Sequence, residues 1–216
     1  MPPIVCIVGK SNIGKTTLLE NLIAELKKRG YTLATVKHDV HGFDVDQPGK
    51  DSWRFAQVGS DAVVISSPQK LALIQKVDHD YTPQELARII GEDYDIILTE
   101  GYKRSQLPKI EVHRKEVSEE LLCSPDDLVA VVTDEPLDLA VWQCSFDEIP
   151  RLADLIEETF ILTREKEDVA LFIDKTSIPL SLFVKQFVVG TLVGMVSTLK
   201  GVAKSPKSID ISIRIR

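Results

Sequence analysis

The sequence predicts a layered α/β fold with a mostly parallel sheet, and three observations support this. Apolar segments of strand length alternate with segments of helical periodicity along residues 4–160, an order typical of strands connected by helical crossovers. A glycine-containing turn separates the first strand from the first helix. Acidic residues directly follow several strands, at the sheet edge where α/β proteins bind their ligands.

The expected elements follow one another in a regular order. Strands are expected at residues 4–8, 31–36, 62–66, 71–76, 94–99, 109–113 and 128–133. Helices are expected where apolar residues recur at three- and four-residue spacing or where a capping box begins a helix, at residues 16–29, 51–58, 82–90 and 146–160. We assign these elements to one domain, residues 1–164.

Residues 165–216 are expected to form a small α+β appendage with the order strand, helix, strand. A charged stretch at 163–168 marks the boundary, and the predicted elements are a strand at 169–174, a helix within 178–200 and an alternating strand at 209–215. Apolar residues at helical spacing along 184–199 predict an amphipathic core or interface helix, and charged and polar residues within it argue against a membrane span.

Composition and charge exclude several classes of function. The chain has 216 residues and a formal net charge of −7, which argues against a general nucleic-acid binder because neutralising phosphates needs a basic surface. Its three cysteines form no C-x-x-C pair, as is typical of a reducing compartment. The N-terminal residues lack the pattern of a signal peptide. We therefore expect a cytoplasmic protein without a nucleic-acid or membrane partner.

The turn at residues 9–16 fits the phosphate-binding pattern G-x-x-x-x-G-K-[ST]. Loop N–H groups and the helix N-terminus are expected to hold phosphates, with Lys15 at the β- and γ-phosphates and Thr16 ligating Mg²⁺. The residues expected to bind nucleotide here are Gly9, Lys10, Ser11, Asn12, Ile13, Gly14, Lys15, Thr16 and Thr17. The motif refines the prediction to a three-layer fold of the P-loop NTPase type.

Three acidic residues at strand ends extend the predicted site. Glu100 ends an apolar strand and is expected to hold Mg²⁺ together with Thr16. Asp39 follows the second strand, and we assign it a catalytic role with Lys15 and Glu100. Asp134 follows the strand at 128–133 and could accept the N1–H and N2–H donors of guanine, since the chain lacks N-K-x-D. An ordinary turn aspartate would occupy the same position.

Histidine and basic residues near these positions indicate a second anionic ligand. The candidates are His38, His41, Arg54, Lys103 and Arg104. His38 and His41 could also hold a transition metal as a His-x-x-His pair, but without a cysteine or a second pair they fit a polar loop better.

These motifs together resemble the family of molybdopterin-guanine dinucleotide biosynthesis adaptor proteins, MobB. The matching segments are 8–19, 37–39, 41–44, 48–54, 66–68, 100–103 and 108–112. The resemblance covers about residues 3–160 and implies a GTP- and Mg²⁺-binding protein with weak GTPase activity that assists guanylation of the molybdenum cofactor. It also implies a homodimer, a molybdenum cofactor guanylyltransferase as partner and molybdopterin as a further ligand.

Two other interpretations stay open. A P-loop small-molecule kinase would transfer phosphate to an acceptor, although no arginine-rich lid segment is evident in the sequence. A non-enzymatic interaction module would bind its partner in a nucleotide-dependent way with negligible turnover. Assays of phosphate transfer, GTP hydrolysis and partner binding separate these interpretations.

Overall fold

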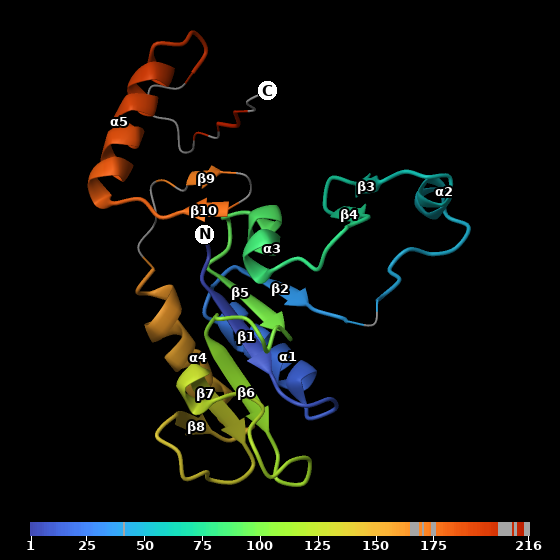
Figure 1. The fold of residues 1–216 in the computed structure, drawn as a ribbon, viewed down its shortest axis with the longest axis vertical. Coiled ribbons are helices and arrows are strands. Elements are labelled where there is room, and N and C mark those ends of the chain that lie inside the picture. The colour runs from blue at the N-terminus through green and yellow to red at the C-terminus, as the bar shows by residue number, and fades with distance from the viewer. Residues whose placement is uncertain are drawn as a thin grey trace. The chain divides into compact units, whose positions relative to one another are not determined.

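The structure is a computed structural model, and it describes residues 1–40, 42–164, 169, 171–173, 176–202, 209 and 211–213. The chain divides into two compact units, one formed by residues 2–164 and the other by residues 165–216 with Met1 (Figure 1). The charged stretch expected at 163–168 lies largely outside the described residues. Each unit is described by itself.

The larger unit is built on a six-stranded parallel sheet with the order β2-β5-β1-β6-β7-β8 (Figure 1). Its central strands are almost completely buried, which explains why their sequences are continuous apolar runs. This sheet confirms the predicted α/β fold. The strands are β1 (Ile4–Val8), β2 (Leu33–Lys37), β5 (Ile96–Glu100), β6 (Lys109–His113), β7 (Leu128–Thr133) and β8 (Trp142–Cys144).

The main core joins the sheet to α1 (Lys15–Lys28) and α4 (Ile149–Ile156). Leu18, Leu22 and Leu26 recur on one face of α1 and are buried, as their spacing predicts. Helix α4 continues into a π-helical turn, Glu157–Ile161. A short 3₁₀ turn, Pro125–Asp127, precedes β7. Neither this turn nor β8 was expected, because three-residue elements are too short to show a period.

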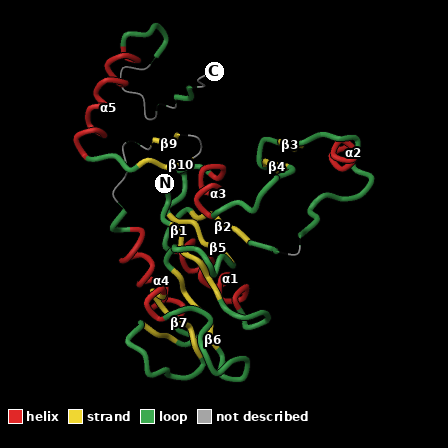
Figure 2. The backbone as a smooth tube through the Cα atoms, in the orientation of Figure 1, coloured by secondary structure: helices red, strands yellow, loops and turns green. Residues whose placement is uncertain are grey.

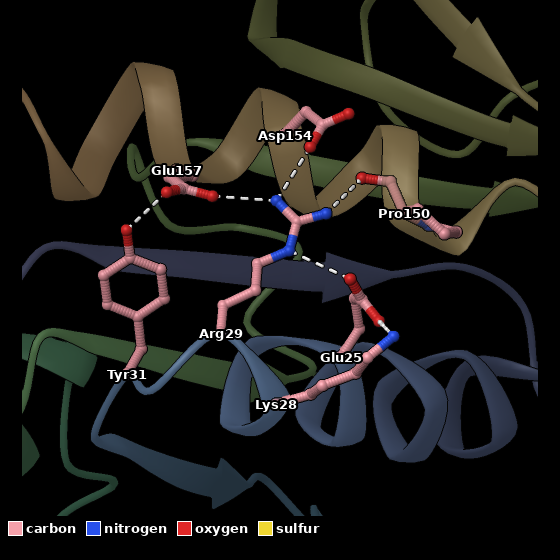
Figure 3. A network of polar contacts seen from close by, with 7 residues as sticks. All are labelled: Glu25, Lys28, Arg29, Tyr31, Pro150, Asp154 and Glu157. Carbon is pink, nitrogen blue, oxygen red and sulfur yellow. Dashed lines mark hydrogen bonds and ion pairs between the residues drawn. The ribbon is translucent and has the colours of Figure 1, made fainter.

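A network of hydrogen bonds joins the C-terminal end of α1 to α4 (Figure 3). The Arg29 guanidinium donates to Glu25, Asp154 and Glu157 at 2.7–2.9 Å, and the Tyr31 hydroxyl donates to Glu157 at 2.5 Å. Burial alone would lower the pKa of Arg29, but the hydrogen bonds that Arg29 donates to Glu157, Glu25 and Asp154 outweigh it and raise this pKa. Arg29 therefore stays charged and holds the two helices together.

Between β2 and α3, the chain makes an excursion, which we define as residues 40–80; His41 is outside the described residues. It contains α2 (Asp51–Gln57) and an antiparallel hairpin of β3 (Ala62–Ser66) and β4 (Leu71–Gln75) (Figure 2). Much of its apolar surface is exposed. Helix α3 (Pro83–Ile90) follows, and Thr82 and Glu85 form the predicted capping box at its start.

The smaller unit begins with an antiparallel pair, β9 (Leu171–Ile173) and β10 (Thr176–Ile178), followed by α5 (Leu182–Ser197). The helix lies within the expected range 178–200, and its N-cap is Ser181, whose hydroxyl accepts from Val184 N. Strand β10 was not expected. Ile209 and residues 211–213 are described without strand structure, and the rest of the strand expected at 209–215 lies outside the described residues.

Helix α5 does not have the predicted amphipathic pattern. Phe187 and Met195 belong to the predicted apolar stripe but are exposed, whereas Lys185 and Val189 lie outside it and are half-buried. The prediction was wrong because apolar residues occupy every side of this helix, so that no single stripe stands out. No helix in the described part of the chain combines the length and apolar character needed to cross a bilayer.

Candidate functional site

The loop between β1 and α1 has a backbone that requires glycine at two positions. Gly9 has φ 149°, and a Cβ added there would lie 2.6 Å from the Val112 carbonyl oxygen. Gly14 has φ 104° and directly precedes α1, where no side chain caps the helix in the described structure. The first N–H groups of α1 thus remain available to an anion, as a phosphate-binding loop requires.

Two side chains at the start of α1 make different contacts, one within the loop and one with the end of β5. Lys15 Nζ donates to the carbonyl oxygen of Lys10 at 2.8 Å, across the loop. The Thr16 hydroxyl donates to Glu100 Oε2 at 3.1 Å. The second contact arises because β5 pairs with β1 in parallel, which places Glu100 beside the loop, as the positions of parallel strand ends predict.

A cavity of about 1040 Å³ opens at this edge of the sheet. It is bounded by the loop after β1, the ends of β2 and β5, and single residues from more distant segments. The predicted residues that line it are Gly9, Ser11, Asn12, Ile13, Gly14, Lys15, Thr16, Thr17, His38, Asp39, Glu100 and Lys103. Ile13 is buried in the core, so it can serve a ligand only through its backbone.

Three predicted site residues are not part of the cavity lining, and a fourth is not described. Lys10, Arg54 and Asp134 are described but do not line the cavity, and His41 lies outside the described residues. The Arg54 side chain is 70% exposed on α2 and pairs with Asp51 at 3.6 Å. Asp134 accepts from Lys115 N at 3.2 Å, beyond the end of β7.

Arg104, which was predicted as a contact of the second anionic ligand, also lines the cavity, together with residues that were not predicted as site residues, among them Lys37 and Asp80. Lys37 directly neighbours the predicted residue His38, so its proximity in sequence was a usable signal. No signal in the sequence pointed to Asp80, because it lies 42 positions from His38, the residue it contacts.

Asp80, the last residue of the excursion, contacts His38, which lies just before its first residue. Its carboxylate oxygens lie 3.0 and 2.9 Å from His38 Nε2, and the imidazole stacks on Tyr102 with ring centroids 4.3 Å apart. Tyr102 has φ 58°, and its hydroxyl donates to the Tyr81 carbonyl at 3.0 Å. Burial, with the nearby Asp80 charge, raises the pKa of Tyr102 to about 12, so its hydroxyl remains a donor at neutral pH.

The Thr16 hydroxyl and the Glu100 carboxylate supply hard oxygen ligands of the kind Mg²⁺ prefers. Within the described residues, no group of three or more His, Cys, Asp or Glu side chains is arranged to hold a metal ion. The pair therefore suits a cation that takes its other ligands from phosphates and water, as Mg²⁺ does.

Comparisons with known proteins agree with this geometry. The family model "Molybdopterin guanine dinucleotide synthesis protein B" matches residues 4–134. A curated molybdopterin-guanine dinucleotide biosynthesis adapter protein from Haemophilus influenzae is 37% identical over 72% of this chain and 88% of its own length. A putative adapter protein of the same description from Methanocaldococcus jannaschii is 23% identical over 98% of this chain and 97% of its own length.

Solved structures show the same fold. The crystal structure of Bacillus subtilis MobB has a TM-score of 0.60 and 27% identity, and the alignment covers 73% of this chain and 98% of that one. The family model covers more than half of the chain, and the relative from Haemophilus influenzae is matched over most of its length. The chain therefore belongs to the molybdopterin guanine dinucleotide synthesis protein B family, MobB.

Proposed function

We propose that this protein is a GTP-binding adaptor, with weak GTPase activity, that assists the guanylation of molybdopterin. The observation that carries the proposal is the Thr16–Glu100 hydrogen bond of 3.1 Å beside a glycine-dependent phosphate loop. The pathway comes from its relatives, which are named as adapter proteins of molybdopterin-guanine dinucleotide biosynthesis. The adaptor would work in the cytoplasm, where its free cysteines stay reduced.

In this proposal the loop backbone and Lys15 hold the triphosphate. Lys15 Nζ would leave the Lys10 carbonyl and turn to the β- and γ-phosphates, a movement of one flexible side chain. Thr16 and Glu100 would hold Mg²⁺, which would neutralise charge on these phosphates. Asp39 and Glu100 both line the cavity, and their carboxylates would accept hydrogen bonds from the attacking water.

The same cavity would take a second anionic ligand, the phosphate of molybdopterin. Four cationic or ionisable side chains support this part of the proposal, namely Lys37, His38, Lys103 and Arg104, all in its lining. Their position at the ends of β2 and β5 would bring the second ligand close to the γ-phosphate side of GTP. His41 and Arg54 remain predicted contacts of this ligand.

The exposed excursion supports the proposed protein partners. Val64 and Leu73 form a cross-strand pair and are 59% and 46% exposed, and an apolar sheet face of this kind favours pairing with another protein surface. We assign it to the homodimer, with the molybdenum cofactor guanylyltransferase as the adaptor's enzyme partner. Residues 1–164 would then form the nucleotide-binding domain and residues 165–216 an accessory unit.

A competition titration of GTP against ATP in the presence of Mg²⁺ tests the proposal. We expect GTP to bind more tightly than ATP and Lys15→Ala to weaken GTP binding by about 100-fold or more, because a charge-assisted contact to the phosphates is lost. Lys28→Ala is the matched control, since Lys28 ends the same helix and its side chain is 81% exposed. Unchanged GTP affinity in Lys15→Ala, or a preference for ATP, would contradict the proposal.

A further inference from the structure

A cluster of three side chains lies against the phosphate loop on the side away from Glu100. The Arg114 guanidinium lies 3.8 Å from the centroid of the Phe146 ring, and Arg114 Nε donates to the Ile13 carbonyl at 3.2 Å. A Cβ at Gly14 would come within 3.8 Å of both Arg114 and Phe146. Asp134 Oδ2 lies 3.8 Å from Arg114 Nη1. The cluster is thus tied to the loop at the point where α1 begins.

The strand order indicates which end of the nucleotide this cluster would lie beside. Strand β5, which carries Glu100, lies on one side of β1, whereas β6 and β7 lie on the other. In the proposed function, Thr16 and Glu100 would hold the metal, and with it the β- and γ-phosphates, on the β5 side. The α-phosphate, the ribose and the base would then extend toward the opposite side. Arg114 follows β6 and Asp134 follows β7, so both lie on that side.

We propose that Arg114, Phe146 and Asp134 form the subsite for the purine base. This inference rests on the proposed function, because it assigns the base end of the same nucleotide. Phe146 holds one face of the planar guanidinium, and the other face stacks on the purine. A stacked base gains affinity without regard to its hydrogen-bonding edge, so Arg114 sets affinity for GTP and ATP alike.

Asp134 supplies the discrimination between bases. Lys115 N donates to Oδ1 at 3.2 Å and fixes the carboxylate, while the 3.8 Å separation of Oδ2 from Arg114 is longer than a hydrogen bond. The carboxylate has lone pairs left for two donors, which matches the adjacent N1–H and N2–H groups of guanine. Adenine lacks this pair of donors, so the subsite favours guanine.

A purely structural role for Arg114 makes a different prediction. Its hydrogen bond to Ile13 also supports the phosphate loop, and loss of that support would weaken every ligand of the loop. Inorganic tripolyphosphate separates the two roles because it has phosphates but no base. The ratio of GTP affinity to tripolyphosphate affinity reports on the base subsite alone.

The experiment measures binding of GTP, ATP, inosine triphosphate and inorganic tripolyphosphate to the full-length chain with Mg²⁺. We expect Arg114→Ala to weaken the binding of GTP and ATP by about 10- to 100-fold, the range of a lost stacking contact. The binding of tripolyphosphate should change by less than about threefold. Phe146→Leu, which keeps an apolar side chain, weakens GTP in the same direction. Asp134→Asn removes the preference of the wild type for GTP over inosine triphosphate.

Arg151→Ala is the matched control, because Arg151 also lies over an aromatic ring, that of Trp142 at 5.6 Å, and the side chain to which it donates a hydrogen bond is Glu148 at the start of α4. It should leave all four affinities unchanged. Equal losses of affinity for GTP and for tripolyphosphate in Arg114→Ala would overturn the base subsite. Unchanged GTP affinity in both Arg114→Ala and Phe146→Leu would also overturn it. A wild-type chain that binds neither GTP nor tripolyphosphate would instead refute the proposed function.

Discussion

Two five-residue strands of this chain have similar apolar sequences but very different surroundings. In β5 the four residues before Glu100 are completely buried between two neighbouring strands. In β3 only Val63 is buried, and the other four residues are exposed. Strand β3 pairs only with β4 in a two-stranded sheet, and two strands alone cover little apolar surface. The difference teaches that the apolar character of a strand predicts that it will be covered, but not by which partner.

The first way to test this comparison is to shorten one leucine in each sheet. Leu98→Ala in β5 should lower the free energy of unfolding by about 2–5 kcal/mol, because it leaves a cavity in a closed core. Leu73→Ala in β4 should cost less than about 1 kcal/mol in the monomer, since its side chain already contacts solvent. Chemical denaturation at several protein concentrations measures both. A large, concentration-independent loss in Leu73→Ala would mean that the excursion has a closed core within one chain.

The second prediction compares the last residues of these strands. Glu100→Gln should weaken GTP binding in the presence of Mg²⁺ by about tenfold and leave Mg²⁺-free binding nearly unchanged, because the amide is a poorer metal ligand. Ser66→Ala, at the end of β3, should change neither affinity. Isothermal titration with and without Mg²⁺ makes the measurement. Equal losses under both conditions would return Glu100 to the role of an ordinary turn carboxylate.

The third prediction concerns the network that closes the larger unit. Tyr31→Phe removes the hydrogen bond to Glu157 and should lower the unfolding midpoint by on the order of 2–4 °C at neutral pH. Tyr81→Phe, at the end of the excursion, is the control, since no hydrogen bond of its hydroxyl is found among the described residues.

The effect of Tyr31→Phe should depend on pH in a defined way. The hydrogen bond from Tyr31, followed by that from Arg29, lowers the pKa of Glu157 below its ordinary 4.5, so this stabilisation is present above pH 4.5 and is lost as the pH falls through the lowered pKa. The same bond raises the pKa of Tyr31 above 10.0, so stabilisation present below pH 10 is lost as the pH rises through the raised pKa. Thermal melts should show the two proteins converging at both extremes; a constant difference would contradict the assignment.

The smallest effect is expected from removing residues 165–216. The core of the larger unit consists of residues from its own sheet, α1 and α4, so the shortened chain should bind GTP within about twofold of the full chain. Its oligomeric state or solubility should change, because α5 carries exposed apolar residues such as Phe183 and Phe187. Light scattering and GTP titration measure the two properties. Loss of GTP binding through unfolding would show that both units share one core.

The sequence by itself determined the central strands, the phosphate loop and the acid beside it. These features are local, because a strand-length apolar run, a glycine pattern and a capping box each need only a few consecutive residues. Gly9 illustrates the point, since the motif required glycine there and the structure supplies the reason in the nearby Val112 carbonyl. The family followed from several such motifs taken together.

Tertiary structure decided which distant residues meet and which apolar surfaces are covered. His38 meets Asp80 across 42 positions, and Arg114 meets the loop at Ile13 across 101 positions, and neither pair leaves a pattern in the sequence. The even apolar composition of α5 likewise concealed which of its sides is covered. Periodicity reports how one segment presents its own side chains, whereas contacts depend on the strand order and packing of the whole unit, which no local pattern encodes.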